Sequence, residues 1–284
     1  MKSKQIYLLG IIILACAGIT AAYSVIAHSE GSEISIVGSS TVQPVAHALA
    51  KEYMVQHPNV KVTVEGGDSN VGIQSVKSGS ASIGTVSRNL TETESDGLNQ
   101  YQIGEDSIAV IVNPTNPVNS LTTDQLRDIY QGKISNWKQV GGEDAPIKVI
   151  IREAGSGTRI TFEDILFGST VPQDNFTIGI STYQVMQDVA VTPNAIGYVS
   201  QNALNTGVKV MGINGISPTD ANIASGRYVL KRPLIFLVKG TGNSAIDDFI
   251  NFSLSPEGQK IVNQTEYNTN STKEYSVSGA GGST

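Results

Sequence analysis

One turn organises this chain, and it reads Arg152-Glu153-Ala154-Gly155-Ser156-Gly157-Thr158-Arg159. It follows the apolar run 147–151 and precedes the pattern 160–167, so the order predicts a strand, a glycine-rich turn and a helix. The first N–H groups of a helix lack intrahelical partners and lie at the positive end of its dipole. The turn therefore predicts an anion site. Hydroxyl and guanidinium donors would come from Ser156, Thr158, Arg152 and Arg159.

The same turn has a plainer interpretation. Gly-Ser-Gly also occurs in ordinary surface turns, and the flanking arginines would then be solvated. A phosphate-cradling NTPase loop is excluded, because the Gly-x4-Gly-Lys-Ser/Thr spacing is absent. The choice between an anion site and a surface turn depends on whether other turns of the chain also place hydroxyl or guanidinium donors at the start of a helix.

Three earlier turns repeat this chemistry. They follow the predicted strands 33–37, 60–65 and 81–86, and each leads into a helical pattern. Short polar residues at helix starts also serve as simple caps, which is the structural alternative. Four such turns in one chain nevertheless favour a shared anion site, with donors from Ser40, Thr41, Ser69, Ser87 and Arg88.

The alternation of strands and helices predicts an open α/β sheet, whose ligands lie beyond the carboxyl ends of the strands. Two long apolar strands, at 106–114 and 232–239, bracket the middle of the chain. If both cross between two lobes, the first lobe is discontinuous and a cleft lies between the lobes. We therefore expect lobe 1 at 30–112 plus 233–270, lobe 2 at 113–232, and a flexible tail at 271–284.

The N-terminus predicts export. Two lysines precede an apolar stretch of about 22 residues, 6–27, so residues 1–29 form a signal peptide or a membrane anchor. Lipidation at Cys16 is a third possibility; as the single cysteine, it can form no internal disulfide. We expect the periplasm or the outer face of the cytoplasmic membrane, with or without a tether. Glycosylation sequons begin at Asn89, Asn175, Asn251, Asn263 and Asn270.

Composition excludes several classes of function. The charged fraction is 15%, the net charge is −6, and no long basic run occurs, which argues against nucleic acid as a partner. A hydrolase with Ser156 or Ser69 as nucleophile is a remote alternative, because the histidines lie at 28, 47 and 57, outside the donor turns. No His/Cys/Asp cluster predicts a metal site, and no cofactor is expected.

The chain resembles the phosphate-binding proteins of ABC-type phosphate importers, which have a periplasmic-binding-protein type II fold of two α/β lobes joined by a two-strand hinge. The resemblance spans Ile34 to about Tyr267. It rests on the segments 38–45, 66–69, 87–88, 108–114, 132–137, 152–159, 195–198 and 254–259.

The resemblance implies a receptor that performs no chemistry. Such a receptor would deliver inorganic phosphate to an ABC-type permease in the membrane. We expect a monomer. Matched position by position, lobe 1 would bind phosphate through Ser40, Thr41, the Val42 amide, Ser69, Ser87 and Arg88. Lobe 2 would close on it with Arg152, Ser156, Gly157 and Thr158.

Two departures from the family pattern affect the site. Many relatives carry an acidic residue where this chain has Ala154, which leaves Glu153 as the candidate partner of Arg152, with Arg159 in support. Asp68 adds a carboxylate to the second turn. Phosphate keeps a proton that sulfate lacks, so an acceptor would discriminate between them; the candidates are Asp68, Asp106, Glu153 or a backbone carbonyl. The alternative is the same fold with another oxyanion, such as sulfate or a phosphonate, as receptor or sensor.

Overall fold

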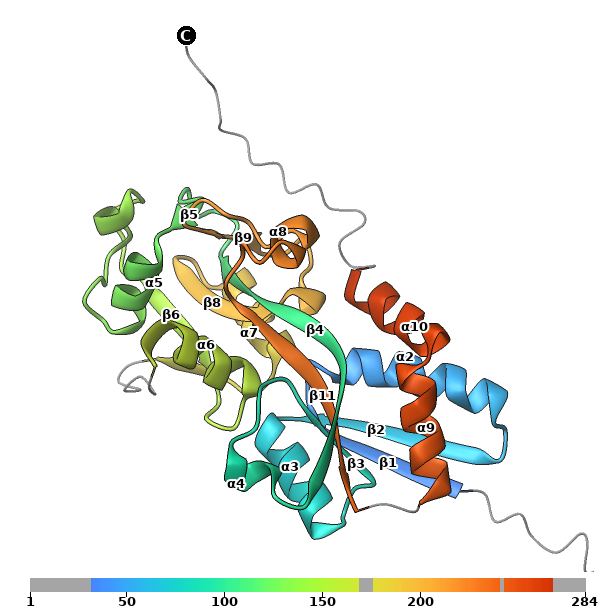
Figure 1. Cartoon of the computed structure of the whole chain (residues 1–284). Helices are drawn as coiled ribbons and strands as arrows, with labels where there is room; N and C mark the ends of the chain where they lie inside the picture. Colours follow the sequence, from blue (N-terminus) through green and yellow to red (C-terminus); the bar gives the residue numbers. More distant parts are fainter. Residues whose placement is uncertain (1–31, 169–175, 241–242, 268–284) are drawn as a thin grey trace, which may run out of the picture.

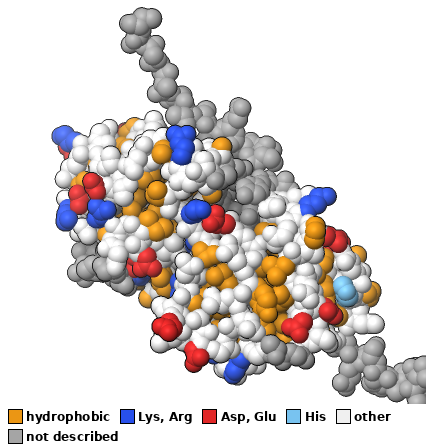
Figure 2. Space-filling model, viewed as in Figure 1, with side chains coloured by type: hydrophobic (Ala, Val, Ile, Leu, Met, Phe, Trp, Pro, Cys, Tyr) orange, Lys and Arg blue, Asp and Glu red, His pale blue; other side chains and the backbone are white. Residues whose placement is uncertain are grey.

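The computed structural model describes residues 32–168, 176–240 and 243–267. The expected signal or anchor, Cys16, the sequon asparagines 175 and 270, and the expected tail lie outside these ranges. Across the ranges that are described, no helix is both long and apolar enough to span a membrane. On the face shown in Figure 2, acidic and basic side chains are interspersed, without a continuous basic area.

The first part of the chain forms an α/β unit that we call lobe 1. Strand β1 pairs in parallel with both β2 and β3, so the carboxyl ends of all three meet at one edge. The elements are β1 (Ser32–Ser39), α2 (Gln43–Gln56), β2 (Val60–Gly67), α3 (Ser69–Ser78), β3 (Ile83–Val86) and α4 (Glu92–Ser95). The chain returns at its end to add α9 (Ser244–Leu254) and α10 (Pro256–Tyr267).

Two long antiparallel strands connect the lobes, as Figure 1 shows. They are β4 (Leu98–Val112) and β11 (Lys231–Lys239). The first part of β4 pairs with β11, and its last five residues, Ile108 to Val112, pair with β8 of the other lobe. The two-strand connection expected from the sequence is therefore confirmed, although β4 begins at Leu98, well before the expected start at 106.

Lobe 2 repeats the parallel arrangement. Strand β6 pairs in parallel with β7 and with β8, and the sheet order is β2-β1-β3-β11-β4-β8-β6-β7. The main elements are α5 (Thr123–Tyr130), β6 (Lys148–Arg152), α6 (Gly157–Phe167), β7 (Thr177–Gly179), α7 (Thr182–Val191) and β8 (Ala195–Ser200). Smaller elements are β5 (Ser120–Leu121), η1 (Trp137–Val140), η2 (Gln201–Ala203), β9 (Lys209–Val210), β10 (Gly212–Ile213) and α8 (Asp220–Ala224).

Each lobe has its own apolar core. In lobe 1, Ile34 and Ile36 of β1 pack with Leu49 and Tyr53 of α2 and with Phe249 of α9. In lobe 2, the core includes Trp137 of η1, Phe162 of α6 and Tyr198 of β8. Separate cores let the lobes move as units about the connecting strands. The lobe boundaries expected from the sequence stay a prediction.

Candidate functional site

Three strand ends of lobe 1 bring hydroxyl groups together. Because β1, β2 and β3 are parallel, the residues that follow them share one edge of the sheet. Ser40, Thr41, Ser69 and Ser87 are all buried there. The turns are also tied together: Ser39 Oγ donates to Ser87 Oγ at 3.0 Å, and Ser69 Oγ accepts from the Ser87 amide at 3.2 Å.

The quoted turn has the predicted form of strand, glycine-rich turn and helix. Strand β6 ends at Arg152, and α6 begins at Gly157 with Ser156 as its N-cap. Ser156 Oγ accepts from the Arg159 amide at 3.3 Å. The amides of Gly157 and Thr158 occupy the first helical positions, where a helix offers no internal acceptor, so they are available to an anion.

The two glycines of this turn lie where the lobes meet. A Cβ atom on Gly155 would lie 2.4 Å from Asp68 Oδ2, and one on Gly157 would lie 2.3 Å from Ser69 Oγ. The Asn70 amide also donates across the cleft to the Gly155 carbonyl oxygen at 3.3 Å. Glycine is therefore required at both positions, because the turn lies so close to Asp68 and Ser69 that a side chain would not fit. These contacts between the lobes mean that the structure has the cleft closed.

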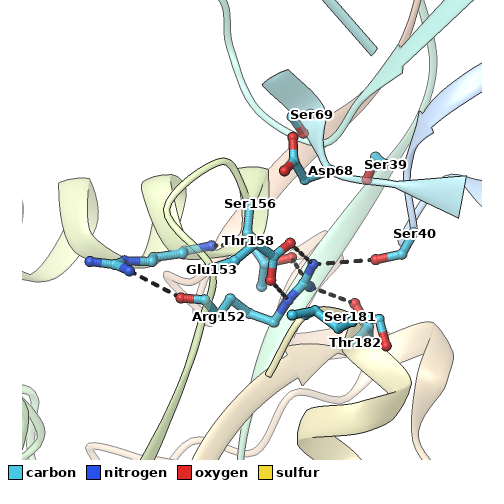
Figure 3. Close-up of polar contacts among 12 residues, drawn as sticks. Ser39, Ser40, Asp68, Ser69, Arg152, Glu153, Ser156, Thr158, Ser181 and Thr182 are labelled. Carbon is cyan, nitrogen blue, oxygen red and sulfur yellow. Dashed lines mark hydrogen bonds and ion pairs between the residues drawn. The ribbon is translucent and has the colours of Figure 1, made fainter. Parts of the chain in front are cut away.

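Arg152 is the central cation of the site. Its guanidinium is buried and paired with Glu153, with Nε to Oε2 at 2.9 Å and Nη2 to Oε1 at 2.7 Å. It also donates to Thr182 Oγ1 at 2.9 Å and, across the cleft, to Ser40 Oγ at 3.3 Å (Figure 3). Its amide donates to Tyr198 Oη at 3.3 Å. Glu153 is thus the partner that holds this guanidinium.

Two of the expected donors of lobe 1 are committed elsewhere. The Val42 amide donates to the Ser39 carbonyl oxygen at 3.0 Å. The Arg88 guanidinium forms two bonds of 2.7 Å with Glu94 and one of 2.8 Å with Asn70 Oδ1. Of its nitrogens, only the buried Nε has no partner among the described residues. These partners all belong to lobe 1, so any contact of Arg88 with an anion would have to use Nε.

The remaining candidate residues have distinct positions. Asp68 caps α3, where Oδ1 accepts from the Val71 amide at 2.8 Å. Arg159 pairs with Glu163 at 2.7 Å and donates to the Arg152 carbonyl oxygen at 3.1 Å, so it supports the turn. Asp106 is fully buried and pairs with Arg232 at 2.8 Å. Burial raises the pKa of Asp106, and the charge of Arg232 opposes that rise.

Sequence reasoning missed two residues of the site, Arg232 and Thr182. Arg232 donates to the hydroxyls of Thr41 and Thr158, and Thr182 accepts from Arg152. Both had a signal. Arg232 directly precedes the apolar run 233–238 and is buried, and Ser181-Thr182 opens a helix just after a strand, as in the other donor turns.

The arrangement is suited to binding an oxyanion. It combines serine and threonine hydroxyls, one central guanidinium and the amides of a helix N-terminus in a buried cleft. In the described part of the chain, the bonds of Ser69 Oγ and Ser156 Oγ come from the Ser87 and Arg159 amides, and neither oxygen bonds to a histidine. A Ser–His nucleophile therefore gains no support.

Comparisons with known proteins agree with this geometry. A family model described as a PBP superfamily domain matches residues 25–257. The phosphate-binding protein PstS of Borreliella burgdorferi is 31% identical over 81% of this chain and 88% of its own length. PstS of Bacillus subtilis is also 31% identical, over 81% of this chain and 77% of its own length.

Solved structures give the same result. A candidate phosphate ABC transporter substrate-binding protein of Clostridium perfringens, solved with bound phosphate, is 36% identical with a TM-score of 0.79, over 83% of this chain and 98% of that one. An ABC-type phosphate transport receptor of Vibrio cholerae is 36% identical with a TM-score of 0.70, over 82% of this chain and 98% of that one.

Proposed function

The chain belongs to the family of phosphate-binding proteins that serve ABC-type importers, and on that premise we propose that it captures inorganic phosphate in the cleft between its lobes. It then delivers the ion to an ABC permease at the outer face of the cytoplasmic membrane. The observation that carries this proposal is the Arg152 guanidinium, which belongs to lobe 2 and donates to Ser40 of lobe 1 inside a buried cleft.

The phosphate would be held by donors from both lobes. Lobe 1 contributes the hydroxyls of Ser40, Thr41, Ser69 and Ser87; lobe 2 contributes Arg152, the Ser156 and Thr158 hydroxyls, and the amides of Gly157 and Thr158. Thr182 holds Arg152 in place. Val42 and Arg88 contribute less, because their donors are largely committed within lobe 1.

The charges of the site explain how a protein of net charge −6 binds an anion. The buried arginines 88, 152 and 232 each form an ion pair with a carboxylate. Recognition therefore depends mainly on directed hydrogen bonds in a water-excluded cleft and little on long-range attraction. We further propose that the protein acts as a monomer and performs no catalysis.

Asp68 is the candidate acceptor for the phosphate proton that lies where the lobes meet. Both oxygens of Glu153 accept from Arg152. Asp106 accepts from Arg232 through Oδ2 alone, so its buried Oδ1 stays a second candidate. Asp68 uses Oδ1 for its helix cap, while Oδ2 lies beside Gly155 at the meeting of the lobes. A protonated phosphate oxygen could donate to Oδ2, whereas sulfate would face a carboxylate without a proton to share.

Calorimetric titration of the ligand-stripped full-length chain with phosphate and then sulfate tests the function. We expect saturable phosphate binding that collapses in Arg152→Ala and persists in Arg127→Ala, a control whose half-buried guanidinium donates to Asp124 and to the Leu166 carbonyl oxygen. The alternative, a receptor for another oxyanion, would be supported if folded protein ignored phosphate and bound sulfate or a phosphonate.

A second titration tests the acceptor. In Asp68→Asn we expect the preference for phosphate over sulfate to shrink by roughly tenfold to hundredfold. An unchanged preference would exclude Asp68 as the acceptor without affecting the proposed function.

A further inference from the structure

Arg232 occupies an unusual place between the lobes. It lies in β11 directly opposite Asp106 of β4, in the strand pair that connects them. Its side chain is fully buried, and Nε and Nη2 donate to Asp106 Oδ2 at 3.0 and 2.8 Å. The guanidinium is therefore fixed to the connection itself and belongs to neither donor turn.

The rest of the guanidinium reaches one hydroxyl from each lobe. Nη2 donates to Thr41 Oγ1 of lobe 1 at 3.1 Å, and Nη1 donates to Thr158 Oγ1 of lobe 2 at 2.5 Å. The two hydroxyl oxygens are 3.4 Å apart. A hydroxyl that accepts from a cation must turn its single proton toward some other acceptor. The two hydroxyls can share one proton with each other or with Thr182 Oγ1. Arg232 thus fills an acceptor position of each hydroxyl and leaves their protons to be directed at a neighbouring hydroxyl or at a bound oxyanion.

A second cation meets the same hydroxyl. Arg152 Nη1 lies 3.5 Å from Thr158 Oγ1, so two guanidinium groups converge on one oxygen. Burial lowers the pKa of Arg232, and the nearby charge of Arg152 lowers it further, against the opposing effect of Asp106. An anion bound beside Thr41 and Thr158 would relieve this repulsion.

We propose that Arg232 is a positioning residue of the anion site: it orients the Thr41 and Thr158 hydroxyls toward phosphate and joins them only when the lobes are closed. The inference rests on the proposed function. Because Asp106 anchors the guanidinium to the connecting strands, both hydroxyls can be satisfied together only in the closed arrangement. Closure and ligand recognition are then coupled through one side chain.

The test is a mutant cycle in the full-length chain, read by phosphate titration. Arg232→Lys keeps the charge beside Asp106 but loses the planar fork that reaches two hydroxyls. We expect phosphate affinity to fall by roughly tenfold to hundredfold, with the midpoint of thermal unfolding little changed. The same substitution in a Thr41→Val/Thr158→Val background should cost less than about threefold, because the hydroxyls it orients are absent.

Two results would overturn the proposal. One is wild-type affinity in Arg232→Lys; the other is an undiminished loss in the valine background, which would mean that Arg232 acts through bulk charge or structure. Failure of the wild-type chain to bind phosphate would instead overturn the proposed function.

A matched control and a second variant complete the design. Lys231 pairs with Glu105 on the same two strands at 3.1 Å, but this pair is exposed, so Lys231→Gln should leave affinity unchanged. If Arg232→Lys does not fold, Asp106→Asn/Arg232→Gln removes both buried charges together. That variant should show the same loss of affinity and the same dependence on the two threonines, and an affinity equal to the wild type would refute the proposal.

Discussion

Arg152 and Arg88 form a natural comparison. Arg152 is the last residue of β6, and Arg88 lies two residues beyond the end of β3. Each forms two short bonds with a carboxylate. Arg152 still reaches across the cleft to Ser40, whereas Arg88 is held within lobe 1 by Glu94 and Asn70.

The difference lies in the position of the carboxylate. Glu153 is the neighbour of Arg152 in the chain and binds Nε and Nη2, which leaves Nη1 for Thr182 and a second bond from Nη2 to Ser40. Glu94 lies six residues beyond Arg88, in the first turn of α4, and occupies both Nη groups. Arg152 is therefore better placed than Arg88 to bind the proposed phosphate, because its carboxylate leaves Nη1 and one bond of Nη2 directed at the cleft.

The largest expected effect separates the two arginines directly. Arg152→Lys should weaken phosphate binding by roughly a hundredfold, because one ammonium cannot replace a fork that contacts Glu153, Thr182 and Ser40. Arg88→Lys should change it by less than about threefold. Titration calorimetry of both variants measures the two losses of phosphate affinity. Equal losses would mean that Arg88 binds the anion through Nε and that the distinction is wrong.

An intermediate effect is expected at the turn that Arg152 opens. A Cβ on Gly157 would lie 2.3 Å from Ser69 Oγ and 2.8 Å from Ser87 Oγ, so Gly157→Ala should hinder closure. We expect roughly a tenfold loss of phosphate affinity with little change in stability, since the open form accommodates the methyl group. Gly67→Ala is the control, because its Cβ would meet nothing nearer than 3.4 Å. Similar affinities in the two variants would contradict a closed cleft in the bound state.

The smallest effect concerns the ion pair between Arg88 and Glu94, and it appears in the free energy of unfolding. The hydrogen bonds from Arg88 lower the pKa of Glu94 from 4.5 to about 2. A carboxyl whose pKa is lowered on folding contributes stability above its unfolded pKa and loses it as the pH falls. Wild-type stability should therefore decline more than that of Glu94→Gln between pH 4.5 and about 2. Urea unfolding across this range measures the difference, and parallel curves would show that the pair contributes nothing.

Much of the fold follows from local patterns. The apolar run before Arg152, the two glycines and the helical pattern after them predict β6, the turn and α6 correctly, because each feature is local. The start of β4 was missed, because residues 98–105 are mostly half-buried or exposed and lack a continuous apolar run. Their strand state depends on pairing with β11, more than 120 residues away in the sequence.

The site was less predictable than the fold. Residue type and position at a strand end identify Ser40, Thr41 and Arg152 as cleft residues, because parallel strands bring their ends together. They cannot tell which way a long side chain turns, as Arg88 demonstrates. Nor do they place Arg232, whose role depends on register: it lies opposite Asp106 only in the folded sheet.

The sheet order has a consequence for the synthesis of this protein. Strand β11 lies between β3 and β4, and α9 and α10, which pack against lobe 1, follow it in the chain. When the chain emerges from the ribosome N-terminus first, lobe 1 has a gap in the middle of its sheet until residues 231–239 arrive. The strands β6, β7 and β8 and their helices are complete earlier. The half of the protein that is made first is therefore the half that finishes folding last.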